Sequence, residues 1–187
     1  MHKVFRFVIF VALLAMIAGP ALAQSKAPAA PKPAPGPAEE ALAAWNDIGR
    51  KVIAMAEDFP EDKYDYKPKP EMRTFAEQLL HIAGANYFFT APARGEKVGE
   101  EDLPRDKYKT KADVVAAVKK SFADGAAVSK EKGDKGMAGE VKHPFANRMA
   151  RLSSLCMDLA MHGGEHYGQL VVYFRLNGIV PPESRPR

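Results

Sequence analysis

Two histidines four residues apart are the side chains whose type and spacing most clearly suggest chemistry in this chain. His162 and His166 lie in a segment with helical apolar spacing. On an α-helix such residues differ by about 40° in direction and about 6 Å in rise, so both imidazoles can reach one ion. Leu155, Leu159 and Tyr173 continue their stripe, which is the face expected to line a helical bundle. The spacing therefore predicts a shared partner for the two rings.

His81 lies in the middle of another apolar segment, between Leu80 and Ile82. Taken alone, a core histidine is more often hydrogen-bonded structure than a ligand, because a carbonyl or carboxylate satisfies a neutral imidazole. Three imidazoles that converge in a bundle would repel when charged and compete for donors when neutral. A divalent cation satisfies all three. The three histidines together therefore predict a metal site.

The string HGGEH at 162–166 also fits the H-x-x-E-H pattern of inverted zinc proteases, in which Glu165 would be the general base. Those proteases take a third ligand from a glutamate well downstream. Here Glu183 is the one acid after His166, and it follows a proline stop. A short motif without its structural context is a weak basis for a protease.

Two glycines and two acids near the histidines have alternative explanations. Gly163 and Gly164 each cost about 1 kcal/mol in a helix relative to alanine. Either a close approach of another helix or ligand, or a kink, would account for them. Asp158 and Glu77 each lie one turn before a histidine and could orient its ring, but simple exposure explains them equally well.

Composition excludes several classes of protein. The chain has 187 residues, 47% apolar and 27% charged, which is typical of one soluble globular domain. One cysteine excludes a disulfide scaffold. The 27 basic and 23 acidic side chains nearly balance, so we expect no nucleic-acid partner.

The N-terminus predicts export. A basic start, an apolar run over residues 7–18 and the sequence Ala21-Leu22-Ala23 are the three parts of a signal peptide, assigned to residues 1–23. A membrane span needs about 20 apolar residues, and Pro20 would break a longer helix. We therefore expect cleavage, no stable membrane anchor afterwards, and a periplasmic location. Residues 24–38 are rich in alanine and proline and predict a disordered linker.

The remaining chain predicts an all-α domain over residues 39–182, followed by a tail at 183–187. Apolar residues recur at threes and fours in four segments, 39–58, 74–91, 110–130 and 147–176. Thr74 with Glu77, and Thr110 with Asp113, predict capping boxes. No strand alternation is evident. The long connections 61–73, 94–109 and 132–144 predict a four-helix bundle with crossing connections rather than simple up-down-up-down order.

The motifs at both ends of this domain resemble those of the DinB-like superfamily, which is unrelated to the DNA polymerase of the same name. The matching strings are FPEDKY at 59–64, TFAEQLLHI at 74–82, HGGEHYGQL at 162–170 and YFRLNG at 173–178. The resemblance implies a four-helix bundle with one metal ligand, His81, from the second helix and two, His162 and His166, from the fourth. Where the family often has arginine, this chain has Tyr167.

The resemblance also implies a range of functions. It suggests a metal-dependent transferase or hydrolase in which a divalent ion, zinc or nickel, activates a thiol or water for attack on a small-molecule substrate. A non-enzymatic metal-binding module or a metal-stabilised structural bundle is the alternative, and a dimer is compatible with either. No catalytic side chain is evident. Tyr167, Gln169 and Tyr173 are candidates for orienting a substrate, and the role of Glu165 stays open.

Overall fold

The computed structural model describes residues 32–186, so the predicted signal peptide and most of the predicted linker lie outside the described residues. The helices are α1 (Pro37–Asp58), α2 (Phe75–Arg94), α3 (Lys111–Met137) and α4 (Leu152–Leu176), with short 3₁₀ turns η1 (Glu61–Lys63), η2 (Arg105–Lys107) and η3 (Pro182–Ser184). Strands β1 (Glu140–Lys142) and β2 (Met149–Arg151) pair antiparallel. Within 32–186, no helix combines the length and hydropathy of a membrane span.

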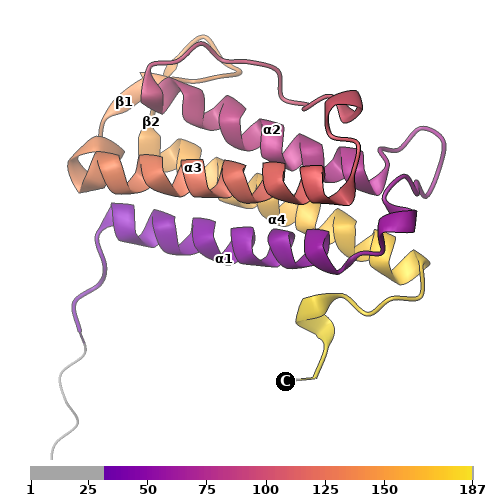
Figure 1. Cartoon of the computed structure of the whole chain (residues 1–187). Helices are drawn as coiled ribbons and strands as arrows, with labels where there is room; N and C mark the ends of the chain where they lie inside the picture. The colour runs from indigo at the N-terminus through magenta and orange to yellow at the C-terminus, as the bar shows by residue number, and fades with distance from the viewer. Residues whose placement is uncertain (1–31, 187) are drawn as a thin grey trace, which may run out of the picture. The chain divides into compact units, whose positions relative to one another are not determined.

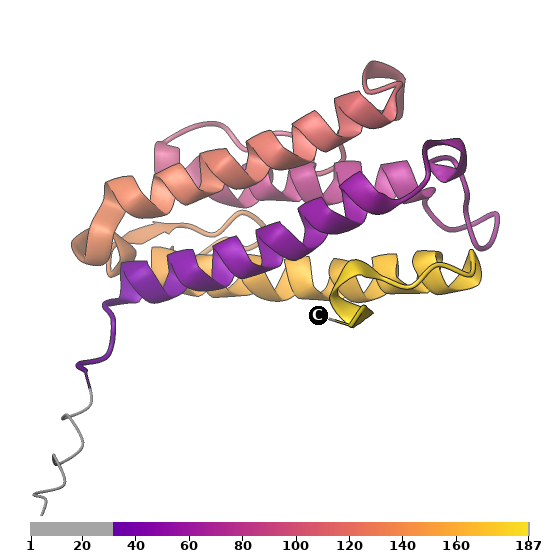
Figure 2. The same ribbon diagram turned by 60° about the horizontal axis from the view of Figure 1, so that its bottom comes forward.

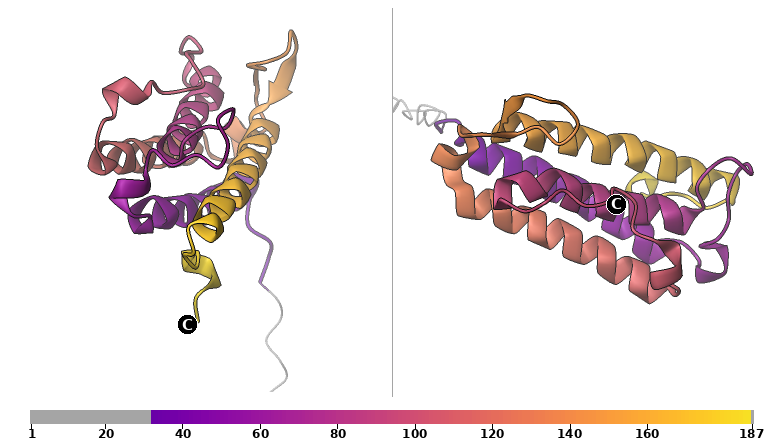
Figure 3. Two further views of the ribbon diagram at one scale, coloured as in Figure 1. Left: turned by 90° about the vertical axis from the view of Figure 1, so that its right-hand side faces the viewer. Right: turned by 90° about the horizontal axis from the view of Figure 1, so that it is seen from above.

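The four helices form a bundle in which α1 and α2 are diagonal partners. α1 packs between α3 and α4 (Figure 2), and α2 also contacts both α3 and α4. The end-on view shows the resulting ring of helices (Figure 3, left). α2 and α3 run in the same direction, opposite to α1 and α4 (Figure 1). The predicted four-helix bundle without simple up-down-up-down order is confirmed.

The parallel direction of α2 and α3 explains the long connection between them. Residues 95–110 must return along the whole of α2 before α3 can begin, and they run across its outer side (Figure 1; Figure 3, right). The backbone comes so close that a Cβ added at Gly84 would clash with the carbonyl oxygen of Glu101. This cover buries α2 on nearly all sides, which matches its apolar composition.

Both predicted capping boxes are present. The side chain of Thr74 accepts a hydrogen bond from the backbone N–H of Glu77, whose carboxylate accepts from the N–H of Thr74. Thr110 and Asp113 make the same exchange at the start of α3. α1 begins at Pro37, two residues before the predicted start, because the fixed φ of proline suits the first helical turn.

The C-terminal ends of two helices, α2 and α3, differ from the predictions. α2 continues past Pro92 to Arg94, because a proline in the last turn removes only one bond, and Gly95 closes the helix in the left-handed conformation at φ 70°. α3 continues to Met137 across a break at Gly133, where φ is 56°. Burial of Met137 against Val128 and Leu152 stabilises this extra turn.

The prediction that the chain has no strands, and that its last helix begins at residue 147, was wrong. β1 and β2 form a hairpin that places Val141 opposite Ala150, and α4 starts only after it, at Leu152. Strands of three residues are too short to show an alternation pattern in the sequence.

Candidate metal centre

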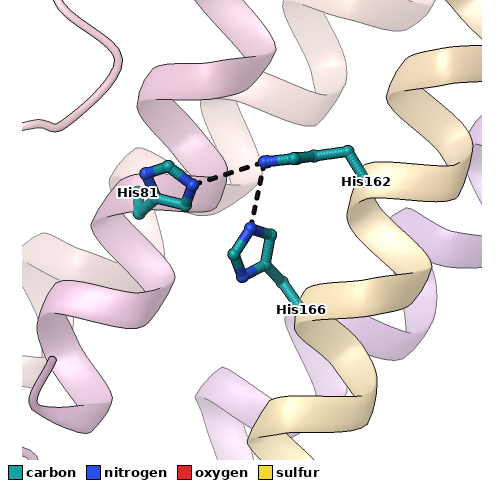
Figure 4. A group of neighbouring side chains, drawn as sticks. All are labelled: His81, His162 and His166. Atoms are coloured by element: carbon teal, nitrogen blue, oxygen red, sulfur yellow. Dashed lines mark hydrogen bonds between the residues drawn. The ribbon is translucent and has the colours of Figure 1, made fainter. Parts of the chain in front are cut away.

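The three predicted histidines meet between two neighbouring helices. His81 extends from α2, and His162 and His166 extend from successive turns of α4 toward it (Figure 4). Nε2 of His162 lies 3.3 Å from Nε2 of His81 and 3.0 Å from Nε2 of His166. One nitrogen of each ring lies within 4.8 Å of the others. The structure therefore brings together the three side chains that the sequence singled out.

The donor atoms fit a divalent cation better than they fit one another. Nε2 of His162 has a single site for a proton or a lone pair, so it cannot make two good hydrogen bonds at once. An ion with bonds of about 2.0–2.1 Å separates adjacent donors by about 2.9 Å in octahedral and about 3.4 Å in tetrahedral geometry. The separations of 3.0 and 3.3 Å lie in this range. Three neutral imidazoles suit zinc, nickel and related ions.

Two of the rings are held from their far side. Nδ1 of His81 contacts Oδ1 of Asp102 at 2.9 Å, and Arg73 pairs with the same carboxylate at 3.2 Å. Burial opposes the ionisation of Asp102, but the charge of Arg73 and the hydrogen bond to His81 outweigh it and lower its pKa. The ionised carboxylate keeps the proton of His81 on Nδ1, which leaves Nε2 free for a metal.

Nδ1 of His166 contacts the amide of Gln78, which also donates to Oε1 of Gln169 at 2.7 Å. When Nε2 of His166 binds a metal, Nδ1 of the ring carries the proton and needs an acceptor. If the side-chain amides of Gln78 and Gln169 are both turned by 180°, the Gln78 oxygen accepts from Nδ1 of His166 and from the Gln169 amide, so both contacts are kept. Nδ1 of His162 has no hydrogen-bond partner among residues 32–186, and Phe89 packs beside its ring with centroids 6.0 Å apart. Packing, not a hydrogen bond, therefore positions His162.

Burial keeps the two histidines of α4 neutral. It is the largest cause of the lowered pKa of His162, and electrostatic repulsion between the His162 and His81 rings is the next. For His166 burial, followed by His162 and His81, lowers the pKa to about 4. Neutral imidazole is the form that binds a metal, so both rings are ready to bind at pH 7.

Of the other residues considered near the histidines, Gly163 and Glu77 have structural roles. Gly163 allows α1 to approach, since a Cβ there would meet Ile48 at 3.0 Å, whereas nothing lies within 4 Å of a Cβ at Gly164. Glu77 caps α2 and does not orient His81. Glu165 is exposed on α4.

The candidates for orienting a substrate are also distributed around the site. The hydroxyl of Tyr173 donates to the carbonyl of Arg73 at 2.6 Å and so holds the segment that carries this guanidinium. Gln169 supports Gln78. Burial, followed by the negative charge of Glu183, raises the pKa of Tyr167.

The sequence analysis missed Gln78, Glu101 and Asp102. Gln78 stands three residues before His81 on the same helix face. Glu101 and Asp102 belong to a charged connection and carry no motif. Glu101 and Asp102 could have been found only from the topology of the chain. A connection that returns along α2 must pass the middle of that helix, where His81 lies.

We predict that Asp102→Ala weakens metal binding by about 10- to 100-fold, which is the range typical when a residue that hydrogen-bonds to a metal ligand is removed. The three nitrogens remain, so the stoichiometry at saturating metal should not change. Competition with a chromophoric chelator measures the affinity, and Asp106→Ala, an exposed acid of the same connection, is the control. Equal affinities in the two variants would show that Asp102 does not support His81.

The fold and the three-histidine cluster agree with the comparison of the chain with known families. The sequence profile of the DinB superfamily matches residues 44–170. This is more than half of the chain, and the chain therefore belongs to the DinB superfamily. No curated protein matches it in sequence.

Solved structures share the fold at low sequence identity. A DinB-like protein of Bacillus cereus ATCC 10987 is 19% identical with a TM-score of 0.65, covering 77% of this chain and 95% of its own. YfiT of Bacillus subtilis, described as a probable metal-dependent hydrolase with an unusual four-helix bundle topology, is 13% identical with a TM-score of 0.62, covering 80% and 94%. YjoA of the same organism is 19% identical with a TM-score of 0.62, covering 79% and 99%.

Proposed function

We propose that this chain is a metal-dependent hydrolase that binds one divalent ion, zinc or nickel, through Nε2 of His81, His162 and His166. The observation that carries the proposal is the convergence of these three atoms, with Asp102 and Gln78 at the opposite nitrogens of two rings. A divalent ion bound there would lower the pKa of a water molecule or thiol and so supply a nucleophile near neutral pH. The description of YfiT supports the same class of activity.

Water is the favoured nucleophile. Low-molecular-weight thiols are abundant chiefly in reducing compartments, and the N-terminal sequence predicts export. A thiol transferase is therefore the less favoured form of the proposal. Both forms require three protein nitrogens that hold the ion while at least one position stays exchangeable.

An open groove on the Asp102 side of His81, which none of the three histidines lines, is large enough for a small molecule. It has a volume of about 430 Å³ and shares Arg73 and Asp102 with the surroundings of His81. Lys67 and Arg105 also line it, and Glu71 and Glu77 add negative charge. The mixed charge suits a polar substrate better than an apolar one.

Cobalt substitution tests whether the ion keeps an exchangeable position. Azide or a small thiol should change the visible spectrum of the cobalt-loaded protein, because each can enter an open coordination position. His81→Ala should abolish the response by disrupting the site. An unchanged spectrum at saturating azide, together with no hydrolysis of small esters and amides above a His162→Ala blank, would favour the non-enzymatic metal-binding alternative.

We also propose that the chain is exported and that the exported form begins at Gln24. The support is the basic, apolar and small-residue pattern of residues 1–23. Intact-mass spectrometry of protein from the periplasmic fraction should give the mass of residues 24–187. Full-length protein in the membrane fraction would contradict the proposal.

A further inference from the structure

We propose that Glu101 supplies a fourth protein ligand, a carboxylate oxygen, to the metal held by the three histidines. The proposal rests on the metal site proposed above. Oε1 of Glu101 lies 3.9 Å from Nε2 of His81 and also 3.9 Å from Nε2 of His162. These are the atoms expected to bind the ion, so the carboxylate faces the donor side of both rings. The next residue along the chain, Asp102, contacts the opposite nitrogen of His81, Nδ1.

The distances suit a ligand that closes onto the ion when the ion binds. Donors bound to one ion by bonds of about 2.0–2.2 Å lie about 2.9–3.5 Å apart, so each 3.9 Å separation needs to shorten by less than about 1 Å. Glu101 has three side-chain torsions, and its side chain is 31% exposed, so a rotation can supply this shift. No movement of the backbone is required.

The backbone that carries Glu101 is fixed on both sides. The carbonyl oxygen of Glu101 lies against Gly84, where a side chain would displace it. Asp102 is tied to His81 and to Arg73. His81 and Gly84 occupy adjacent positions on successive turns of α2, so one helix face positions both the nitrogen ligand and the segment carrying the carboxylate.

A fourth protein ligand limits which ions can support the proposed reaction. Three imidazoles and one carboxylate fill a tetrahedral ion, whereas an ion with five or six positions keeps room for water. The negative charge of the carboxylate also offsets part of the charge of the divalent ion. A water molecule or thiol bound to the ion would therefore have a higher pKa than with three imidazoles alone. Ions that readily take more than four ligands, such as nickel and cobalt, are therefore better suited to activity than tetrahedral zinc.

Metal affinity and the cobalt spectrum together test the proposal. Glu101→Gln and Glu101→Ala should lower the cobalt affinity by more than the roughly 10- to 100-fold expected when a residue that hydrogen-bonds to a metal ligand is lost. Both variants should also shift the visible absorption bands of the bound cobalt. Azide should bind more tightly to Glu101→Ala than to the unmodified chain, because a position is vacated. Glu100→Gln, an exposed neighbouring acid, should match the unmodified chain. Asp102→Ala should lower the affinity while leaving the bands in place.

Gly84→Ala gives a test that leaves every polar group intact. The added methyl group would meet the Glu101 carbonyl, so it should displace the connection and reproduce the spectral shift of Glu101→Ala. Thermal melts of the metal-free variants check that the bundle is retained. If the unmodified chain binds cobalt with the histidines while both Glu101 variants keep its affinity and spectrum, the fourth ligand is overturned and the three-histidine site stands. If the unmodified chain binds no metal, the proposed function itself fails.

Discussion

Replacing His162 by alanine should abolish stoichiometric metal binding. Nε2 of His162 is the common neighbour of the other two donors, at 3.3 Å from His81 and 3.0 Å from His166, so its loss leaves two nitrogens on different helices without their bridge. The side chain is largely enclosed, and a water molecule cannot restore the ring that packs beside Phe89. Elemental analysis after metal loading and gel filtration should find about one ion per unmodified chain and almost none in the variant.

His143→Ala is the matched control for this experiment. Nδ1 of His143 accepts hydrogen bonds from the backbone N–H groups of Phe145 and Ala146 at 3.1 Å, so its role is to shape the hairpin loop. The variant should keep the metal content of the unmodified chain. The site is misassigned if His143→Ala loses the metal while the alanine variants of His81, His162 and His166 all retain it.

The metal-free protein should lose stability as the pH falls from 7 toward 4. Burial and the two neighbouring imidazoles lower the folded-state pKa of His166 from 6.5 to about 4. Between these values the unfolded chain binds more protons than the folded one. The free energy of unfolding is therefore at its full value above about pH 6.5 and falls progressively as the pH drops below it. For His166 alone the loss is about 3 kcal/mol once the pH is below the folded-state pKa. The lowered pKa of His162 adds in the same direction.

Urea denaturation of the chelator-treated protein at several pH values measures this effect. Carboxylates titrate near the lower end of the range, so the informative quantity is the difference between the unmodified chain and His166→Asn, which lacks the titrating ring. The variant should show a flatter pH dependence, and His143→Ala should not. A pH dependence of equal steepness in the unmodified chain and His166→Asn would contradict the assigned burial of this imidazole.

Local patterns predicted the four helices and singled out the three histidines that the structure brings together. The 3.6-residue period of α4 places His162 and His166 on one face in any bundle, and the Thr74 capping box marks the start of α2, which fixes the face that carries His81. The family resemblance pointed to the same three side chains. What the residues alone could not define was how α2 and α4 face each other, because that depends on the order of helices around the bundle.

The acidic side of the site could not be predicted for the same reason. Glu101 and Asp102 lie about twenty residues after His81 in a segment without periodicity, and only the parallel run of α2 and α3 brings them back to it. Gly84 was the available hint, since a glycine inside a buried helix often marks a close approach of another backbone. The hairpin before α4 was missed because its stability comes from pairing between segments with no strand signal of their own.

Anomalous X-ray scattering from crystals of the metal-loaded protein tests the central claim most directly. Data collected at the absorption edge of the bound metal should give one strong peak per chain, within bonding distance of Nε2 of His81, His162 and His166. The same map shows whether Oε1 of Glu101 has moved to the ion. A fully loaded crystal with no peak between the three rings, or with its peak at other side chains, would contradict the account of this chain as a three-histidine metal protein.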